Sequence, residues 1–313
     1  MNTNDAAEAS RGDAVNVLSF LVVVSLCLAL AAYTVLRVTH TDPRGLLAHL
    51  DGRVVVPASA RGPVSAPPPA LAAATAAAQP VLELPPEASP AEVVSHGDRS
   101  RPLVALTFDA DMTPAMVQDL QSGRVKRFVN DGVVAALHDL DVPATFFLSG
   151  LWIERYPDTA RAIAADPNFE VASQGYSQQA FRADCLSLPT IDLARATDDL
   201  ERSQTVIEGI SSRPVPFFRF PGGCYDAASL AAIRPANLQV VEYDVVSGDA
   251  FATDPARIVG QTVPAVQNGS IVVLHLTGGN TAPVTDRALP GIVRQLRARG
   301  FQLVRVSDLL LRR

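Results

Sequence analysis

The 313-residue sequence has few cysteines and no excess of basic side chains. Three cysteines are too few for the disulfide framework that holds many small secreted domains together. Lys and Arg number 26 against 32 Asp and Glu, which gives a net charge of -6. The absence of a basic stripe argues against a nucleic-acid partner. With 48% hydrophobic residues, the chain is instead suited to bury one good core.

Charged side chains are also absent from residues 15–36, VNVLSFLVVVSLCLALAAYTVL. As a helix this segment would span about 33 Å, enough to cross a bilayer core of roughly 30 Å. A cleaved signal peptide is the alternative, because Ala29, Leu30 and Ala31 have the small-residue spacing of a cleavage site. The apolar run continues past that point and residues 1–14 are acidic, so we favour a retained single-pass anchor.

Residues 37–100 are rich in proline and alanine, as in PPPALAAATAAAQPVLELPPEASP. Such a composition cannot bury a core and is typical of a disordered, semi-rigid spacer. We therefore expect an N-terminal tail over residues 1–14, an anchor over 15–36, a linker over 37–100 and a folded domain over 101–313.

The expected domain consists of apolar runs that alternate with segments of helical periodicity. The candidate strands are, in chain order, LVALTF, ATFFL, FEVAS, PFFRF, QVVEYDVV, SIVVLHL and FQLVRV. Most of these runs are almost continuously apolar, as in strands that are covered on both faces. Strands that alternate with helices predict an α/β fold with a parallel sheet, either open or closed into a barrel.

Polar or charged residues follow or end five of these strands. They are Asp109 and Asp111 after LVALTF, Gln174 after FEVAS, Arg219 in PFFRF, Asp249 after QVVEYDVV, and His275 in SIVVLHL. The carboxyl ends of the strands are where parallel α/β barrels build their active sites. The repetition over successive strands predicts a site at that edge of the sheet.

Five segments resemble, in order and spacing, the motifs of the polysaccharide deacetylases, the NodB homology family. They are ALTFDADMTPAM, SQGYSQ, FFRFPGGCYD, DVVSGDAF and IVVLHLTGG. The resemblance covers roughly residues 103–310. It implies a distorted parallel (β/α) barrel of about seven strands. It also implies hydrolysis of N-acetyl amide bonds in peptidoglycan or chitin-like polymers, with a divalent metal such as zinc.

The resemblance also assigns roles to individual residues. It implies that Asp109 is the general base, that His275 is the general acid, and that the backbone N–H of Gly222 donates to the oxyanion. Arg219 and Asp249 match the arginine of the third motif and the aspartate of the fourth motif. A general acid has to deliver a proton to the departing amine, and backbone N–H groups stabilise the tetrahedral oxyanion. All five positions carry the residue type that the motifs require.

The metal positions depart from the family pattern. Ala110 replaces the second aspartate of the first motif, although Asp111 follows directly, and Gln174 and Gln178 replace the two histidines of the second motif. From Leu103 onward the chain has only two histidines, at 138 and 275, and His138 is expected on the surface of a helix. Glutamine oxygens suit hard ions such as Ca²⁺ better than zinc. We therefore predict an eroded metal site and name no cofactor.

Two functions remain open at this stage. The first is a membrane-tethered hydrolase of N-acetyl groups on cell-envelope glycan, whose activity is weak, altered or lost. The second is a catalytically silent relative that binds glycan or a protein partner. Arg37 and Arg44 after the apolar span, against Arg11 before it, favour a cytoplasmic domain. The expected substrate lies outside, so we predict a membrane protein with an extracytoplasmic domain.

Two of the three cysteines follow the loops that carry the second and third motifs. Cys185 and Cys224 either remain free thiols or form a bridge. In an exported domain the bridge is favoured, because disulfides persist in oxidising compartments.

Overall fold

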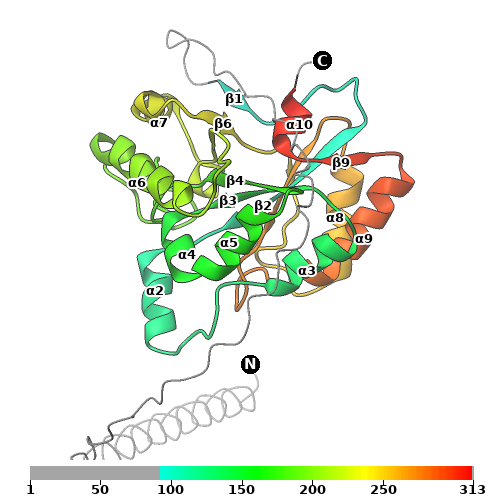
Figure 1. Cartoon of the computed structure of the whole chain (residues 1–313), viewed down its shortest axis with the longest axis horizontal. Helices are drawn as coiled ribbons and strands as arrows, with labels where there is room; N and C mark the ends of the chain where they lie inside the picture. The colour runs from blue at the N-terminus through cyan, green and yellow to red at the C-terminus, as the bar shows by residue number, and fades with distance from the viewer. Residues whose placement is uncertain (1–91, 312–313) are drawn as a thin grey trace, which may run out of the picture. The chain divides into compact units, whose positions relative to one another are not determined.

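The computed structural model describes residues 92–311. The expected tail, the anchor over 15–36 and most of the linker lie outside the described residues. Within residues 92–311, no helix has both the length and the apolar character needed to cross a membrane. Figure 1 draws the described residues as a coloured ribbon.

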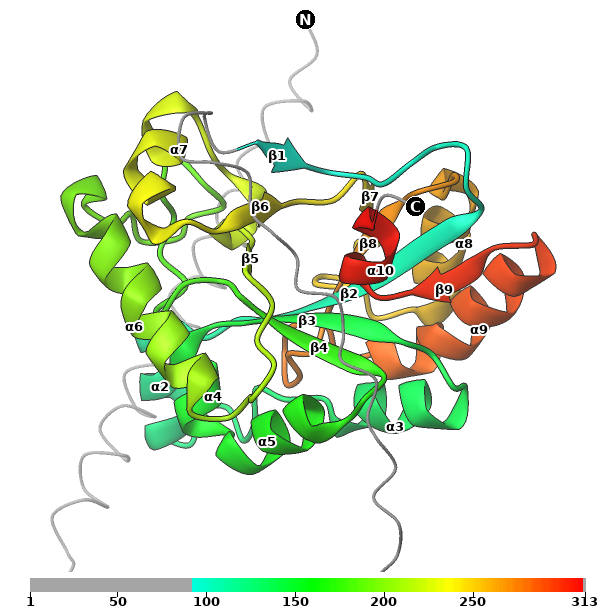
Figure 2. The ribbon, with the colours of Figure 1, turned by 45° about the horizontal axis from the view of Figure 1, so that its top comes forward.

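A parallel sheet of nine strands forms the centre of the domain (Figures 1 and 2). The strands are β1 (Val93–Val94), β2 (Leu103–Ala110), β3 (Ala144–Leu148), β4 (Phe169–Ser173), β5 (Phe217–Phe218), β6 (Gln239–Val241), β7 (Val245–Val246), β8 (Ile271–His275) and β9 (Gln302–Val304). They lie in the order β1-β6-β5-β4-β3-β2-β8-β7, and β9 pairs with the first residues of β2. The parallel α/β class expected from the alternating pattern is therefore confirmed.

The number of strands differs from the predicted seven, for two reasons. The run QVVEYDVV is divided into β6 and β7, which pair with different neighbours: β6 with β5 and β1, and β7 with β8. The strand order ends with β1 at one edge and β7 at the other, so the curled sheet stays open between these two edges. The short strand β1 lies in the segment expected to be linker, so the folded domain begins before residue 101.

The segment that contains β1 crosses this opening. Val93 and Val94 pair with β6, whereas His96 forms a bridge with Ser270, directly before β8. The Gly97 N–H donates to the Gly269 carbonyl at 2.8 Å. Residues 93–97 thus connect the two parts of the sheet that flank the opening.

Helices line the outside of the curled sheet (Figure 2). They are α2 (Pro114–Gln121), α3 (Asp131–Asp139), α4 (Gly150–Arg155), α5 (Pro157–Ala165), α6 (Ala196–Glu208), α7 (Ala227–Ile233), α8 (Pro255–Ala265) and α9 (Thr285–Ala298). The short helix α10 (Val306–Leu310) packs instead against the inner face of the sheet. In α9 the buried residues Leu289, Ile292, Val293 and Leu296 recur at the helical period, so one apolar stripe faces the sheet.

The two faces of β2 belong to different parts of the core. Even-numbered residues such as Leu106 and Phe108 join the large cluster under the outer helices, which also buries Trp152. Odd-numbered residues point to the inside of the curl, because side chains alternate along a strand. There Leu103 and Ala105 pack in an inner apolar cluster with residues of α10. The next two side chains on this inner face, Thr107 and Asp109, are polar and belong to the candidate active site.

Candidate active site

The parallel register brings the motif residues to one edge of the sheet. Asp109 of β2 is the Cα partner of His275 at the end of β8. Gln174 directly follows β4, and Arg219 directly follows β5. Because strands of a parallel sheet end at the same edge, residues far apart in the sequence meet here.

Arg219 is fully buried and holds Asp109. One guanidinium nitrogen donates to Asp109 Oδ1 at 2.6 Å and to Thr107 Oγ1 at 2.8 Å. Its Nε donates to the Val241 carbonyl at 3.1 Å, and the group lies 3.9 Å from the centre of the Phe147 ring. A buried charge needs such a set of partners to offset its desolvation. The ion pair expected for Arg219 is therefore made with Asp109.

Asp249 holds His275 through a carboxylate whose two oxygens both have hydrogen-bond partners. Its Oδ1 lies 2.7 Å from His275 Nδ1 and accepts from Ser247 Oγ at 2.8 Å. Its Oδ2 accepts from the His275 backbone N–H and from Thr285 Oγ1. Burial opposes a charge on the imidazole, but the attraction of Asp249 outweighs it and raises the pKa of His275 to about 10. At neutral pH the ring is thus an imidazolium, the state that a general acid requires.

The two glutamines that replace histidines are buried, not surface residues. Gln174 is 1% exposed and Gln178 is 3% exposed. Gln174 Nε2 donates to Asp109 Oδ2 at 2.9 Å, and Gln178 Nε2 donates to Asp111 Oδ1 at 2.8 Å. Burial, and next the negative charge of Asp109, raises the pKa of Asp111 to about 6, although His275 opposes the shift. An ionised carboxylate only accepts hydrogen bonds, which sets the amide orientation with the N–H groups facing it.

These residues do not fit the zinc ion of the family. An amide nitrogen has no lone pair for a metal, and both of these nitrogens already point their hydrogens at carboxylates. Both amide oxygens, Gln174 Oε1 and Gln178 Oε1, are buried without a hydrogen-bond partner. No group of three or more His, Cys, Asp or Glu residues within the described ranges could hold a metal ion.

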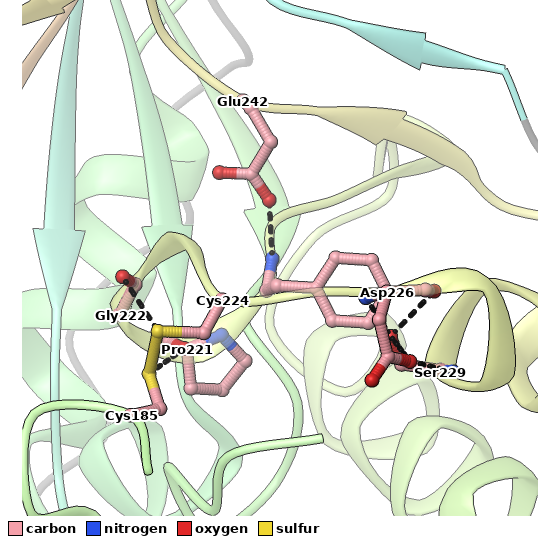
Figure 3. The surroundings of a disulfide bond; sticks show 8 residues. Cys185, Pro221, Gly222, Cys224, Asp226, Ser229 and Glu242 are labelled. Carbon is pink, nitrogen blue, oxygen red and sulfur yellow. Dashed lines mark hydrogen bonds between the residues drawn. A yellow bond between two sulfur atoms is a disulfide. The ribbon is translucent and has the colours of Figure 1, made fainter. Parts of the chain in front are cut away.

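The loop expected to supply the oxyanion donor is held in place by a disulfide. Cys185 and Cys224 are bonded, with their Cα atoms 5.9 Å apart, and flank this loop in Figure 3. Gly222 has a φ of +68°, and a Cβ there would lie 2.7 Å from Cys185 Sγ. On the other side of the loop, Glu242 accepts the Phe220 N–H at 3.0 Å. The disulfide and the bond to Glu242 thus hold the loop from two sides.

Sequence reasoning missed the residues that support the motif positions. Thr107 bonds Arg219, while Ser247 and Thr285 bond Asp249. Glu242 is also buried, with Oε2 unpartnered, and burial raises its pKa to about 7. Its signal was available, since it is a charged residue inside an apolar run. The expected surface residue His138 is half exposed and pairs with Asp166 at 3.3 Å.

Sequence comparison places this geometry in a family. A profile described as polysaccharide deacetylase matches residues 96–241. A chitooligosaccharide deacetylase of Bradyrhizobium sp. is 26% identical over 211 residues, covering 64% of this chain and 87% of that protein. A peptidoglycan-N-acetylglucosamine deacetylase of Bacillus cereus is 25% identical over 210 residues, covering 66% of this chain and 88% of that protein.

Solved structures share the fold. A Bc1960 peptidoglycan N-acetylglucosamine deacetylase gives a TM-score of 0.58 at 20% identity, over 70% of this chain and 92% of that one. A CE4 family pseudoenzyme from Bacillus anthracis also gives 0.58, at 21% identity, over 71% of this chain and 70% of that one. The ordered motifs and the profile match show that this chain contains a polysaccharide deacetylase domain, and the solved structures share its fold.

Proposed function

We propose that this domain binds N-acetylated cell-envelope glycan and has lost the metal-dependent hydrolysis of the family. One observation carries the proposal: the buried amides of Gln174 and Gln178 present N–H donors to the carboxylates of Asp109 and Asp111. In an enzyme of the family that space belongs to a cation and its ligands. Here each of the two carboxylates accepts a hydrogen bond from a neutral amide instead.

The expected loss of rate can be bounded. A metal that polarises an amide carbonyl and activates water contributes several kcal/mol to the lowering of the barrier. A loss of about 5 kcal/mol corresponds to a rate lower by several thousandfold. Asp109 cannot compensate readily, because Arg219 and Gln174 already occupy both of its oxygens. The site that remains is therefore better suited to hold a polar ligand than to cleave it.

The names of the relatives support glycan as the ligand. Two of them are deacetylases of chitooligosaccharide and of peptidoglycan N-acetylglucosamine. The Bacillus anthracis pseudoenzyme shows that a fold of this kind exists without activity, and a mutant of it has restored enzymatic activity.

A second candidate is slow deacetylation without a metal. The imidazolium of His275, oriented by Asp249, favours it, because a charged acid remains able to protonate a departing amine. The same experiment distinguishes the two candidates.

The test uses the purified full chain and N-acetylglucosamine oligomers. We expect calorimetric titration to show binding, and acetate assays to show no release that depends on added Zn²⁺. Zinc-dependent release at ordinary enzyme rates, roughly 1–10³ per second, would overturn the loss of hydrolysis. Zinc-independent release above that of a His275→Gln variant would favour the second candidate. Absence of binding would refute glycan as the ligand.

We also propose that residues 15–36 anchor the chain in the cell membrane with the domain outside. The uncharged composition of the span and the Cys185–Cys224 bridge support this, since disulfides persist in oxidising compartments. Protease added to intact spheroplasts should digest the domain. Protection until the membrane is permeabilised would place it in the cytoplasm.

A further inference from the structure

We infer that the groove between α2 and α6 binds the peptide branch of peptidoglycan, a short peptide that carries both carboxylate and ammonium groups. The inference rests on the proposed function, because the glycan itself occupies the candidate active site beside the groove. It identifies the bound polymer as a peptide-bearing glycan, in contrast to a neutral chitin-like one.

The groove opens at the same edge of the sheet as the candidate active site, because its lining comes from segments that follow β2, β3 and β4. Its volume is about 710 Å³, within the range of about 300–1,000 Å³ that is typical of ligand pockets. Here α2, α4 and α6 lie side by side (Figures 1 and 2). Ser177 and Gln179 line the groove on either side of Gln178, which bonds Asp111 in the site. A branched ligand can therefore extend from the site into the groove.

One wall of the groove is a charged face of α6. Its members recur at i, i+3, i+4 and i+7, the spacing of one helix face, and are Arg195, Asp198, Asp199 and Arg202. The charges therefore run positive, negative, negative, positive over about 10 Å of helix. The facing wall, from α2, is uncharged and includes Val117 and Gln121. The charged face thus decides which ligand fits.

The two arginines at the ends of this face have no acidic partner. Neither Arg195 nor Arg202 forms an ion pair with any residue in the described part of the chain. The Arg202 guanidinium lies 3.5 Å from the centre of the Tyr176 ring, and one of its nitrogens bonds the Tyr176 hydroxyl. A guanidinium stacked on an aromatic ring is held in place, and its other nitrogens remain able to bind a carboxylate.

The two aspartates between the arginines differ in their partners. Asp199 accepts the Tyr176 N–H at 2.7 Å and lies 3.4 Å from Ser177 Oγ, so it holds the loop of the second motif. Asp198 is exposed and lines the groove. Its carboxylate is therefore accessible to a positively charged group of a ligand.

The alternation of charge selects the ligand. A neutral polymer of N-acetylglucosamine has no charged group to pair with this face, and a purely acidic polymer is repelled by its aspartates. The peptide branch of peptidoglycan combines carboxylates with the ammonium group of its diamino acid. Its carboxylates match Arg195 and Arg202, and its ammonium group matches Asp198. A few such exposed ion pairs together raise the affinity about tenfold.

The experiment measures binding to the purified full chain by calorimetry at low salt. The two ligands are fragments of peptidoglycan glycan with their peptides, and the same fragments after an amidase has removed the peptides. We expect the peptide-bearing fragment to bind about tenfold more tightly, and the difference to shrink as salt is added. Arg195→Met should remove most of the difference and leave the affinity for the peptide-free fragment unchanged. Arg213→Met, at an exposed arginine outside the groove, is the matched control and should change neither affinity.

Equal affinity for the two fragments, or an equal loss for both in Arg195→Met, would overturn the inference. So would an affinity that rises with the length of N-acetylglucosamine oligomers and loses that rise in Arg195→Met, which would assign the groove to sugar rings. Equally tight binding of a free all-L peptide of the same charge would assign it to a protein partner.

The two proposals fail in different ways. Peptide-dependent binding without any binding of peptide-free glycan refutes only the proposed function. Glycan binding that does not depend on the peptide refutes only the role of the groove. Circular dichroism of each variant excludes misfolding as the cause of a loss.

Discussion

At the scale of single residues, the site is decided by which atoms face the carboxylates. Asp109 accepts hydrogen bonds from a guanidinium and from an amide. Asp111 accepts a hydrogen bond from an amide, and Asp249 is paired with the imidazolium of His275. Each of these three carboxylates thus has a hydrogen-bond donor of its own. None of the donating nitrogens turns a free lone pair toward a carboxylate. A histidine in place of either glutamine would reverse this, because a neutral imidazole presents an acceptor nitrogen on one side.

Gln174→His combined with Gln178→His should create a zinc site. The two imidazoles supply nitrogen ligands beside Asp109 and Asp111, in the two-histidine-plus-carboxylate pattern that suits zinc. Elemental analysis after dialysis is expected to show about one zinc per chain in the double variant and none in the wild type. Equal zinc content in both proteins would show that the amides already hold the metal.

The pair of Asp249 and His275 predicts the pH dependence of stability. The folded pKa of His275 is about 10, above its ordinary value of 6.5, so protonation favours the folded state. Its contribution to the unfolding free energy is complete below about pH 6.5 and is lost as the pH rises through about 10. Urea unfolding over this range should show a steeper decline for the wild type than for His275→Gln. Parallel profiles would contradict the raised pKa.

At the scale of elements, the important unit is the loop between β5 and α7 with its disulfide. The bridge joins two cysteines that are 39 residues apart in the sequence, and it places the sulfur of Cys185 close to Gly222. The loop therefore depends on two local constraints, a covalent link and a backbone conformation that favours glycine. Each can be removed separately.

Replacement of both Cys185 and Cys224 by serine should destabilise the domain. A closed loop of this length removes about 4 kcal/mol of chain entropy from the unfolded state at 25 °C. Measured losses for native disulfides are about 2–5 kcal/mol, and denaturant unfolding should give a value in that range. An unchanged unfolding midpoint would show that the bridge adds nothing to the folded domain.

Gly222→Ala tests the backbone conformation together with the contact to the disulfide. The variant combines a positive φ with a Cβ 2.7 Å from Cys185 Sγ, so a loss of about 2–4 kcal/mol is expected. Gly123→Ala is the matched control, because Gly123 has a φ of +73° and nothing within 4 Å of the added Cβ. It should lose only about 1 kcal/mol, the cost of the backbone conformation. Equal losses in the two variants would refute the role of the contact.

At the scale of the whole molecule, the sheet is open between its edge strands β1 and β7, and residues 93–97 reach across from β6 to the start of β8. Residues 93–97, at the start of the domain, are therefore an integral part of the sheet. A boundary at residue 101, as the composition suggested, would remove the connection and expose the edge of β6.

A chain that begins at residue 101 should therefore be less stable than one that begins at residue 92. It loses the pairing of β1 with β6 and the bonds around His96 and Gly97. Each lost hydrogen bond contributes about 0.5–1.5 kcal/mol, so a decrease of several degrees in the unfolding temperature is expected. Indistinguishable melting curves of the two chains would refute a structural role for this segment.

Much of the fold could be predicted from the sequence, because a strand that is buried on both faces consists of a continuous apolar run. Such a run can be recognised without knowledge of the structure. All seven predicted runs contain strands. The two-residue strand β1 could not be found, since so short a segment has no periodicity. The break at Glu242–Asp244 could not be found either, because strand pairing depends on neighbours that are distant in the chain.

The amino-acid sequence by itself determined the family, through five motifs in order, and the replacement of two histidines by glutamine. Only the tertiary structure decided that Gln174 and Gln178 are buried and that their nitrogens face the acids. The physical reason is that residue type sets which atoms can donate or accept. Which of those atoms is turned toward a carboxylate depends on the fold that surrounds both groups.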